Sequence, residues 1–199
     1  MRQYFFILIL IFLGGCSITK SVPAKVEYRL TAPMVAPIVN SSCSDITLKI
    51  EPIQSSSLLL ENRMYYVLDE VEQRHFTQSL WSQSPNKRVE QILKKVIIES
   101  NLFASVLDYR SNAATQWRYE VRILDAMQYF SGEKSYVKLS MNFVLIRNVG
   151  REVVSSKHFE VELPTQTADA KGGVLALNSA VNTIVTQSVE WLQAECQNY

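Results

Sequence analysis

The chain has few of the residues that build reactive centres. It contains two histidines, His75 and His158, six glycines and three cysteines. Neither histidine has a partner at a spacing typical of a metal site or a catalytic triad. Gly-x-Ser-x-Gly, His-Glu-x-x-His, Cys-x-x-Cys and phosphate-binding glycine loops are absent from the sequence. The sequence therefore gives no reason to expect an enzyme, a metal site or a cofactor.

The chain also lacks an excess of charge of either sign. Lys and Arg number 20 and Asp and Glu 19, which gives a formal net charge of +1. This near-neutrality argues against a nucleic-acid partner, because such a partner needs a basic face. It also argues against binding to an anionic membrane by charge alone.

The longest apolar run, from Tyr4 to Leu13, covers about ten residues and is too short to span a bilayer of about 30 Å. It follows Arg2 and has the size of the apolar region of a signal peptide. Gly14 and Gly15 precede Cys16, and this pattern resembles the lipobox of bacterial lipoproteins. An ordinary signal peptide or a signal anchor are the alternatives, but an Ala-x-Ala cleavage site is absent.

In the lipoprotein interpretation, residues 1–15 are the signal peptide and Cys16 becomes the acylated first residue of the mature chain. Two or more acyl chains anchor a protein stably to a membrane. Ser17 follows, and by the same resemblance Ser at this position permits export to the periplasmic face of the outer membrane, where Asp would retain the protein at the inner membrane. We expect a lipid anchor, with palmitate among the acyl chains, in the cell envelope.

Two further cysteines remain, Cys43 and Cys196. In an oxidising compartment they could form a disulfide that ties the start of the folded domain to its C-terminal end. Two unrelated thiols are the alternative to this bond. A role of Cys43 as a nucleophile is a further, minor alternative.

Residues 16–44 are interrupted by Pro23, Pro33 and Pro37 and lack a hydrophobic period, so we expect a flexible, lipidated tether. Within it, Tyr28-Arg29-Leu30 is either an isolated apolar patch or a short edge strand docked on the domain. We expect the domain itself to cover residues 45–199.

The domain shows both strand and helix periodicities. Alternating apolar residues predict strands at 46–53, 64–68, 74–80, 102–107, 116–130, 136–146 and 152–163. Ser84 as N-cap and Pro85 in the first turn begin an amphipathic helix of about fifteen residues that Asn101 can stop, and a second helix runs from about Gly172 or a little earlier to near Glu195. The pattern predicts an α+β two-layer sandwich, with two helices on one face of a mainly antiparallel sheet.

The order of these features resembles a known family. The relevant segments are the lipobox, Tyr28-Arg29-Leu30, Arg63-Met64-Tyr65-Tyr66, Trp81-Ser82-Gln83-Ser84-Pro85, Asn101 to Val106, and Val189-Glu190-Trp191-Leu192. Together they resemble the auxiliary lipoprotein component of ABC-type transport systems, the family that includes paraquat-inducible protein C. The likeness covers about residues 28–193. It departs from the family at Leu80-Trp81-Ser82, where Arg-Trp-Ala is usual, and at Ser55–Ser57.

The resemblance implies a non-catalytic docking subunit that works with an ABC permease, an ATPase and a mammalian-cell-entry (MCE) domain protein in lipid transport. Tyr65, Tyr66 and Trp81 are of the residue types that dominate interfaces, and they are candidates for partner contact. Core or sheet-face positions are the alternative for all three. Two other functions remain open: a lipid or small-ligand carrier with cargo in its own cleft, which needs a large apolar cavity, and a general envelope-assembly lipoprotein.

Overall fold

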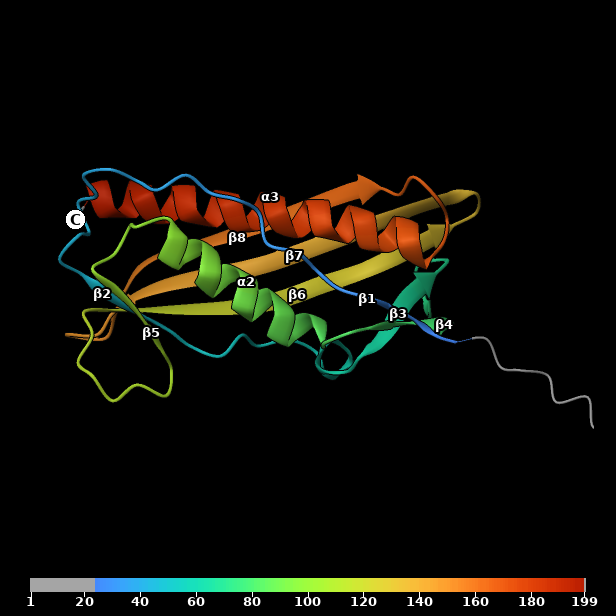
Figure 1. Cartoon of the computed structure of the whole chain (residues 1–199), viewed down its shortest axis with the longest axis horizontal. Helices are drawn as coiled ribbons and strands as arrows, with labels where there is room; N and C mark the ends of the chain where they lie inside the picture. The colour runs from blue at the N-terminus through green and yellow to red at the C-terminus, as the bar shows by residue number, and fades with distance from the viewer. Residues whose placement is uncertain (1–23, 199) are drawn as a thin grey trace, which may run out of the picture.

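The computed structural model describes residues 24–198, so the predicted signal peptide, Cys16 and Ser17 lie outside the described residues. One sheet forms one layer, and helices α2 and α3 form the other (Figure 1). The strands are β1 (Val26–Tyr28), β2 (Thr47–Ile50), β3 (Arg63–Leu68), β4 (Glu72–Trp81), β5 (Ser105–Asp108), β6 (Trp117–Ser131), β7 (Lys134–Arg147) and β8 (Glu152–Pro164). The helices are α2 (Pro85–Glu99) and α3 (Ala170–Gln197), with a 3-10 turn η1 (Ser57–Leu60). The predicted α+β sandwich is confirmed.

The long strands β6, β7 and β8 form the predicted antiparallel meander. Their alternating pattern places one row of apolar side chains under the helices, and the members of this row on β6 and β7 are buried: Trp117, Tyr119, Val121, Ile123, Val137, Leu139, Met141, Phe143 and Leu145. Gly132 and Gly150 adopt positive φ in the two turns, a conformation that glycine enters without steric cost. Local periodicity and turn chemistry therefore explain this half of the sheet.

The remaining strands join the sheet through parallel pairings that the periodicity does not reveal. β2 and β3 both run parallel to β6, β2 beside its first residues and β3 beside its last. β5 pairs with β2, and β1 pairs with β4, each also in parallel. Most residue pairs of the sheet nevertheless belong to antiparallel ladders, β3–β4 included.

Each helix begins at a recognisable signal. α2 starts at Pro85 and its N-cap residue is Ser84, although the Ser84 side chain makes no capping hydrogen bond. Asn101 follows α2 with a φ of 53°, which fits its predicted role as a stop. At the start of α3, the Asp169 carboxylate accepts a hydrogen bond from the Gly172 amide at 2.7 Å. With this cap α3 begins at Ala170, within the predicted start at or a little before Gly172.

The described part of the predicted tether is packed against the domain. β1 is a short edge strand on β4, as in the second alternative for the segment around Tyr28. Leu30 is 1% exposed, and its carbonyl accepts a hydrogen bond from Arg88 Nε at 2.8 Å. Farther along, the Thr31 amide donates to Asn178 on α3, and the Ile38 amide donates to the Ser100 carbonyl. From Val26 onward the segment is therefore not a free tether, because buried side chains and backbone hydrogen bonds hold it.

Candidate functional site

The predicted partner-contact tyrosines lie side by side on β3 but face opposite sides of the sheet, as adjacent strand residues must. Tyr65 is half-buried, and its hydroxyl donates a hydrogen bond to Glu61 Oε2 at 2.9 Å. Tyr66 belongs to an aromatic cluster with Phe76 of β4 and Phe130 of β6, whose ring centroids lie 4.7 and 5.2 Å from its own. We call these three residues the aromatic cluster. All three are half-buried, so the cluster keeps accessible apolar surface.

Trp81 lies in a different environment. It is the last residue of β4 and is 7% exposed, within the hydrophobic core. Its amide donates to the Asn62 carbonyl, and β1 pairs beside it at Tyr28. The structure therefore does not place the three predicted contact residues on one surface. Trp81 has the core role that was the alternative for all three.

Phe76 and Phe130 were not predicted as site residues. Phe76 lies in an alternating stretch and Phe130 at the end of another, so each was interpreted only as a strand residue. They meet because β3 lies between β4 and β6, and the parallel β3–β6 pairing links segments far apart in sequence. Aromatic residues on three predicted strands were the available signal, but it could not be used without the strand order.

An exposed ion pair borders the aromatic cluster. Arg74 Nη2 lies 2.6 Å from Glu72 Oε1, and a hydrogen bond to this carboxylate raises the pKa of Arg74, which therefore stays charged. Arg74 is also the cross-strand neighbour of Tyr66. An apolar aromatic patch with a charged margin is the composition found where proteins contact one another, so this end of the β3–β4 hairpin is a candidate docking surface.

The space between the sheet and the helices is closely filled in the described residues. A cavity lined by Leu59, Met64, Trp81, Gln128 and Leu177, among others, provides about 20 Å³. This is room for about one water molecule, whereas ligand pockets usually measure about 300–1,000 Å³. The cavity is too small to hold an acyl chain.

A larger hollow lies on the sheet face opposite the helices. This groove of about 650 Å³ is lined by residues including Arg118, Glu120, Arg122, Leu124 and Asn142. Arg118 is paired with Glu120 at 3.1 Å, and Arg122 donates a hydrogen bond to Gln54 at 2.6 Å. The lining combines these paired side chains with apolar ones, including Ile53, Leu124 and Val144. The groove is open, so a hydrocarbon chain lying in it would stay in contact with charged side chains and water.

Farther along the same face, Asp125 is partly buried and accepts a hydrogen bond from the Tyr129 hydroxyl. Loss of hydration raises the pKa of Asp125, and burial together with the carboxylate raises the pKa of Tyr129. The Tyr129 ring stacks on Tyr136 with 5.3 Å between centroids. The Tyr129 hydroxyl and the Asp125 carboxyl group are hydrogen-bonded to each other, which fits a structural pair rather than a reactive one.

One grouping on this face has the residue types of a hydrolase triad. His158 Nε2 lies 3.5 Å from Ser140 Oγ and 3.9 Å from Glu160 Oε2. A triad needs the hydroxyl and the carboxylate on opposite ring nitrogens, so that the imidazole can take up a proton from one while the other orients it. Here both groups approach the same nitrogen, and the grouping lacks that geometry.

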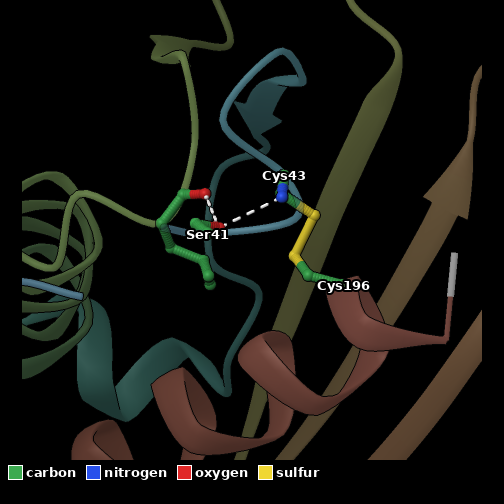
Figure 2. Close-up of a disulfide and its surroundings, with 4 residues drawn as sticks. Ser41, Cys43 and Cys196 are labelled. Atoms are coloured by element: carbon green, nitrogen blue, oxygen red, sulfur yellow. Dashed lines mark hydrogen bonds between the residues drawn. A yellow bond between two sulfur atoms is a disulfide. The ribbon is translucent and has the colours of Figure 1, made fainter. Parts of the chain in front are cut away.

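At the opposite end of the molecule, Cys43 and Cys196 are joined by a disulfide with an S–S distance of 2.00 Å (Figure 2). The Cys43 amide donates to Ser41 Oγ, and Ser41 Oγ donates to the Leu102 carbonyl at 2.6 Å. The bond and these two hydrogen bonds fix the N-terminal segment to the end of α3 and to the loop after α2. The pairing that the sequence left open is thus present in the structure.

The described residues also bear on metal binding and on membrane insertion. Within residues 24–198, His, Cys, Asp and Glu side chains do not gather in a group of three that could hold a metal ion. None of the helices in that range combines the length and the apolar character needed to cross a membrane.

Comparison with known proteins places the chain in a family. The ABC-type transport auxiliary lipoprotein component family matches residues 28–188. The crystal structure of protein XCC0632 from Xanthomonas campestris is similar, with a TM-score of 0.78 and 17% identity over 87% of this chain and 97% of that one. Another similar structure is the hypothetical protein CT253 from Chlamydia trachomatis, with a TM-score of 0.56 and 6% identity over 78% of this chain and 99% of that one. At these identities the solved structures support the fold alone.

No curated protein sequence matches the chain. The family match spans the sheet, α2 and most of α3, and it agrees with the resemblance that the sequence motifs carry. This chain belongs to the ABC-type transport auxiliary lipoprotein component family.

Proposed function

We propose that this protein is a non-catalytic docking subunit of an ABC transport system, anchored by an acylated Cys16 at the periplasmic face of the outer membrane. In this role it works with the permease, the ATPase and an MCE-domain protein in lipid transport and envelope maintenance. Family membership supports the transport role, and the family is an auxiliary one rather than a catalytic one. The MCE protein, the lipid cargo and the outer-membrane address rest on the resemblance and on Ser17.

The observation that carries this proposal is the filled interior. A carrier that holds an acyl chain in its own cleft needs a cavity far larger than the 20 Å³ between the sheet and the helices. The docking role needs only an accessible contact surface, which the aromatic cluster and its ion pair provide. The structure therefore favours docking over cargo binding.

The anchor has a direct test. Mass spectrometry of the mature protein should find acyl chains on Cys16, and globomycin should block maturation. A Cys16→Ser variant should leave the membrane fraction, and a Ser17→Asp variant should move to the inner membrane. A Cys16→Ser protein that still fractionates with membranes would contradict the anchor.

The contact surface is tested by photo-crosslinking in living cells. A photoreactive residue at Tyr66 or Arg74, which belong to the aromatic cluster and its charged margin, should capture a subunit of the transporter. The matched control is Val149, which is well exposed in the β7–β8 turn near the opposite end of the molecule and should capture none. Capture of unrelated envelope-assembly proteins at Tyr66 and Arg74 would support a general envelope-assembly lipoprotein instead, and equal capture from Val149 would refute this surface.

Arg74→Ala supplies the matching loss-of-contact variant, because this exposed side chain borders the aromatic cluster and its removal leaves the core intact. We expect co-purification of the partner to fall while the thermal midpoint changes little. Trp81→Ala is the opposite control. It removes a core residue, so it should lower the thermal midpoint whether or not a partner protein is present.

A further inference from the structure

Strand β8 forms an edge of the sheet for thirteen residues. In the described residues it pairs with β7 alone. The other edge strands, β1 and β5, are short, with three and four residues. Natural proteins usually shorten or cover edge strands, because unpaired backbone groups can pair with another chain. A long edge of this kind is a candidate interaction surface.

Two features limit the part of β8 that another strand can use. A bulge at Val154 interrupts the register between Val153 and Ser155. At the other end Pro164 has no amide hydrogen to donate. The regular stretch is therefore 155–163, nine residues or about 30 Å of strand, and its midpoint is Phe159.

The two faces of this stretch differ. Phe159, Val161 and Leu163 point toward the helix side and are half-buried. Four exposed polar residues point the other way, namely Ser156, His158, Glu160 and Glu162. An added strand must continue both rows, apolar on one face and polar on the other. The sequence of β8 itself meets this requirement.

We propose that β8 pairs with β8 of a second copy of this chain, antiparallel and about a two-fold axis at Phe159. This register uses all nine regular residues, with Ser155 opposite Leu163 of the second copy. On the polar face it places His158 opposite Glu160 and Ser156 opposite Glu162, each twice by symmetry. The pairing would add about eight backbone hydrogen bonds and join two sheets into one.

Charge excludes most other registers of the β8–β8 pair. Residues directly opposite each other in an antiparallel pair point to the same face, so the two-fold axis must pass between the two copies of one residue and not between two successive residues. An axis at Lys157 or Glu160 opposes that charge to itself, and an axis at Val161 opposes Glu160 to Glu162 twice. Like charges placed directly opposite are unfavourable. An axis at His158 avoids this, but it loses the His158–Glu160 pairs and shortens the regular pairing to seven residues.

Lys157 must also fit, because lysines on edge strands often prevent pairing. Its ammonium lies 6.0 Å from the Phe159 ring centroid, on the helix side. In the proposed register Lys157 lies opposite Val161 of the second copy. Its aliphatic stem can cover that valine while the charge stays in water.

Cysteine crosslinking tests the register with exposed residues. Position 156 of one copy should lie about 5 Å from position 162 of the other, within disulfide reach, whereas each position lies about 20 Å from itself. Full-length Ser156→Cys and Glu162→Cys proteins should form a covalent dimer on mild oxidation when expressed together, and neither should do so alone. Self-crosslinking of either variant, absence of the mixed dimer, or capture of a different protein would overturn the pairing.

A charge swap in the purified full-length protein tests the same contacts. His158→Glu opposes carboxylates twice, so we expect the dimer to weaken about tenfold or more in sedimentation equilibrium. Adding Glu160→Lys should restore the affinity to within about threefold, with the thermal midpoint of each variant as the folding control. A monomeric wild-type protein, or no rescue by the second change, would refute the pairing. Neither test requires the anchor or the transporter, so its failure would leave the docking proposal standing.

Discussion

The disulfide between Cys43 and Cys196 is the feature whose loss has the most predictable consequence. Cys43→Ala and Cys196→Ala each remove the same crosslink, which joins residues 153 positions apart. In the chain-entropy model, closing a loop of this size restricts the unfolded chain enough to contribute about 5 kcal/mol to the free energy of unfolding. Measured values are often smaller, so we expect each variant to lose about 3–5 kcal/mol.

Urea unfolding of the wild type, both single variants and the double variant measures this loss. Because both substitutions break one bond, the double variant should be no less stable than either single variant to within about 0.5 kcal/mol. Reduced wild type, which keeps both sulfur atoms, should fall to nearly the same stability. A loss below about 1 kcal/mol would refute the reasoning, and so would a double variant whose loss equals the sum of the single losses.

Three further predictions concern single side chains. Leu30→Ala removes a 1% exposed residue of the N-terminal segment, so it should lower the free energy of unfolding by about 2–5 kcal/mol and increase proteolysis of that segment; an unchanged digestion pattern would contradict its packed role. Asp169→Ala removes the cap on Gly172 and should cost about 1 kcal/mol at pH 7. Hydrogen bonds from Gly172 and Thr167 lower the pKa of Asp169, so the difference from wild type should shrink as acid protonates the carboxylate; a difference constant with pH would refute the cap. Burial raises the pKa of Asp125, so ionisation should destabilise the fold as the pH rises from the ordinary value of about 3.9 through the raised one. Asp125→Asn should flatten that part of the stability profile, and an unchanged profile would refute the assignment.

The elements that the sequence predicts well are those whose signals are local. β6, β7 and β8 alternate over thirteen to fifteen residues, and their predicted and observed bounds agree closely. α2 has its apolar stripe and Pro85 at its first turn, so its position was also predictable. These features depend on residues a few positions apart, and hydrophobic periodicity records them directly.

The features that the sequence left open or did not predict depend on distant partners. β1 contains Val26, Glu27 and Tyr28, and it is a strand because the end of β4 lies beside it. Most of the predicted tether, residues 16–44, is therefore part of the domain. The β1–β4 pairing, the burial of Leu30 and the disulfide at Cys43 hold it there. Trp81 was a candidate for partner contact because of its residue type, but its environment is decided by β1 and by the core residues around it.

This packing limits where the docking surface can act. If Cys16 carries the acyl chains, nine residues separate it from Val26, the first residue of β1, and the ten steps of backbone between the two can span at most about 35 Å. A free tether up to residue 44 would have reached almost three times as far. β1, β3 and β4 lie together at one end of the molecule, and the C-terminus lies at the other (Figure 1). The aromatic cluster therefore lies at the same end as β1. If Cys16 is acylated, a partner that binds the cluster must approach close to the membrane surface.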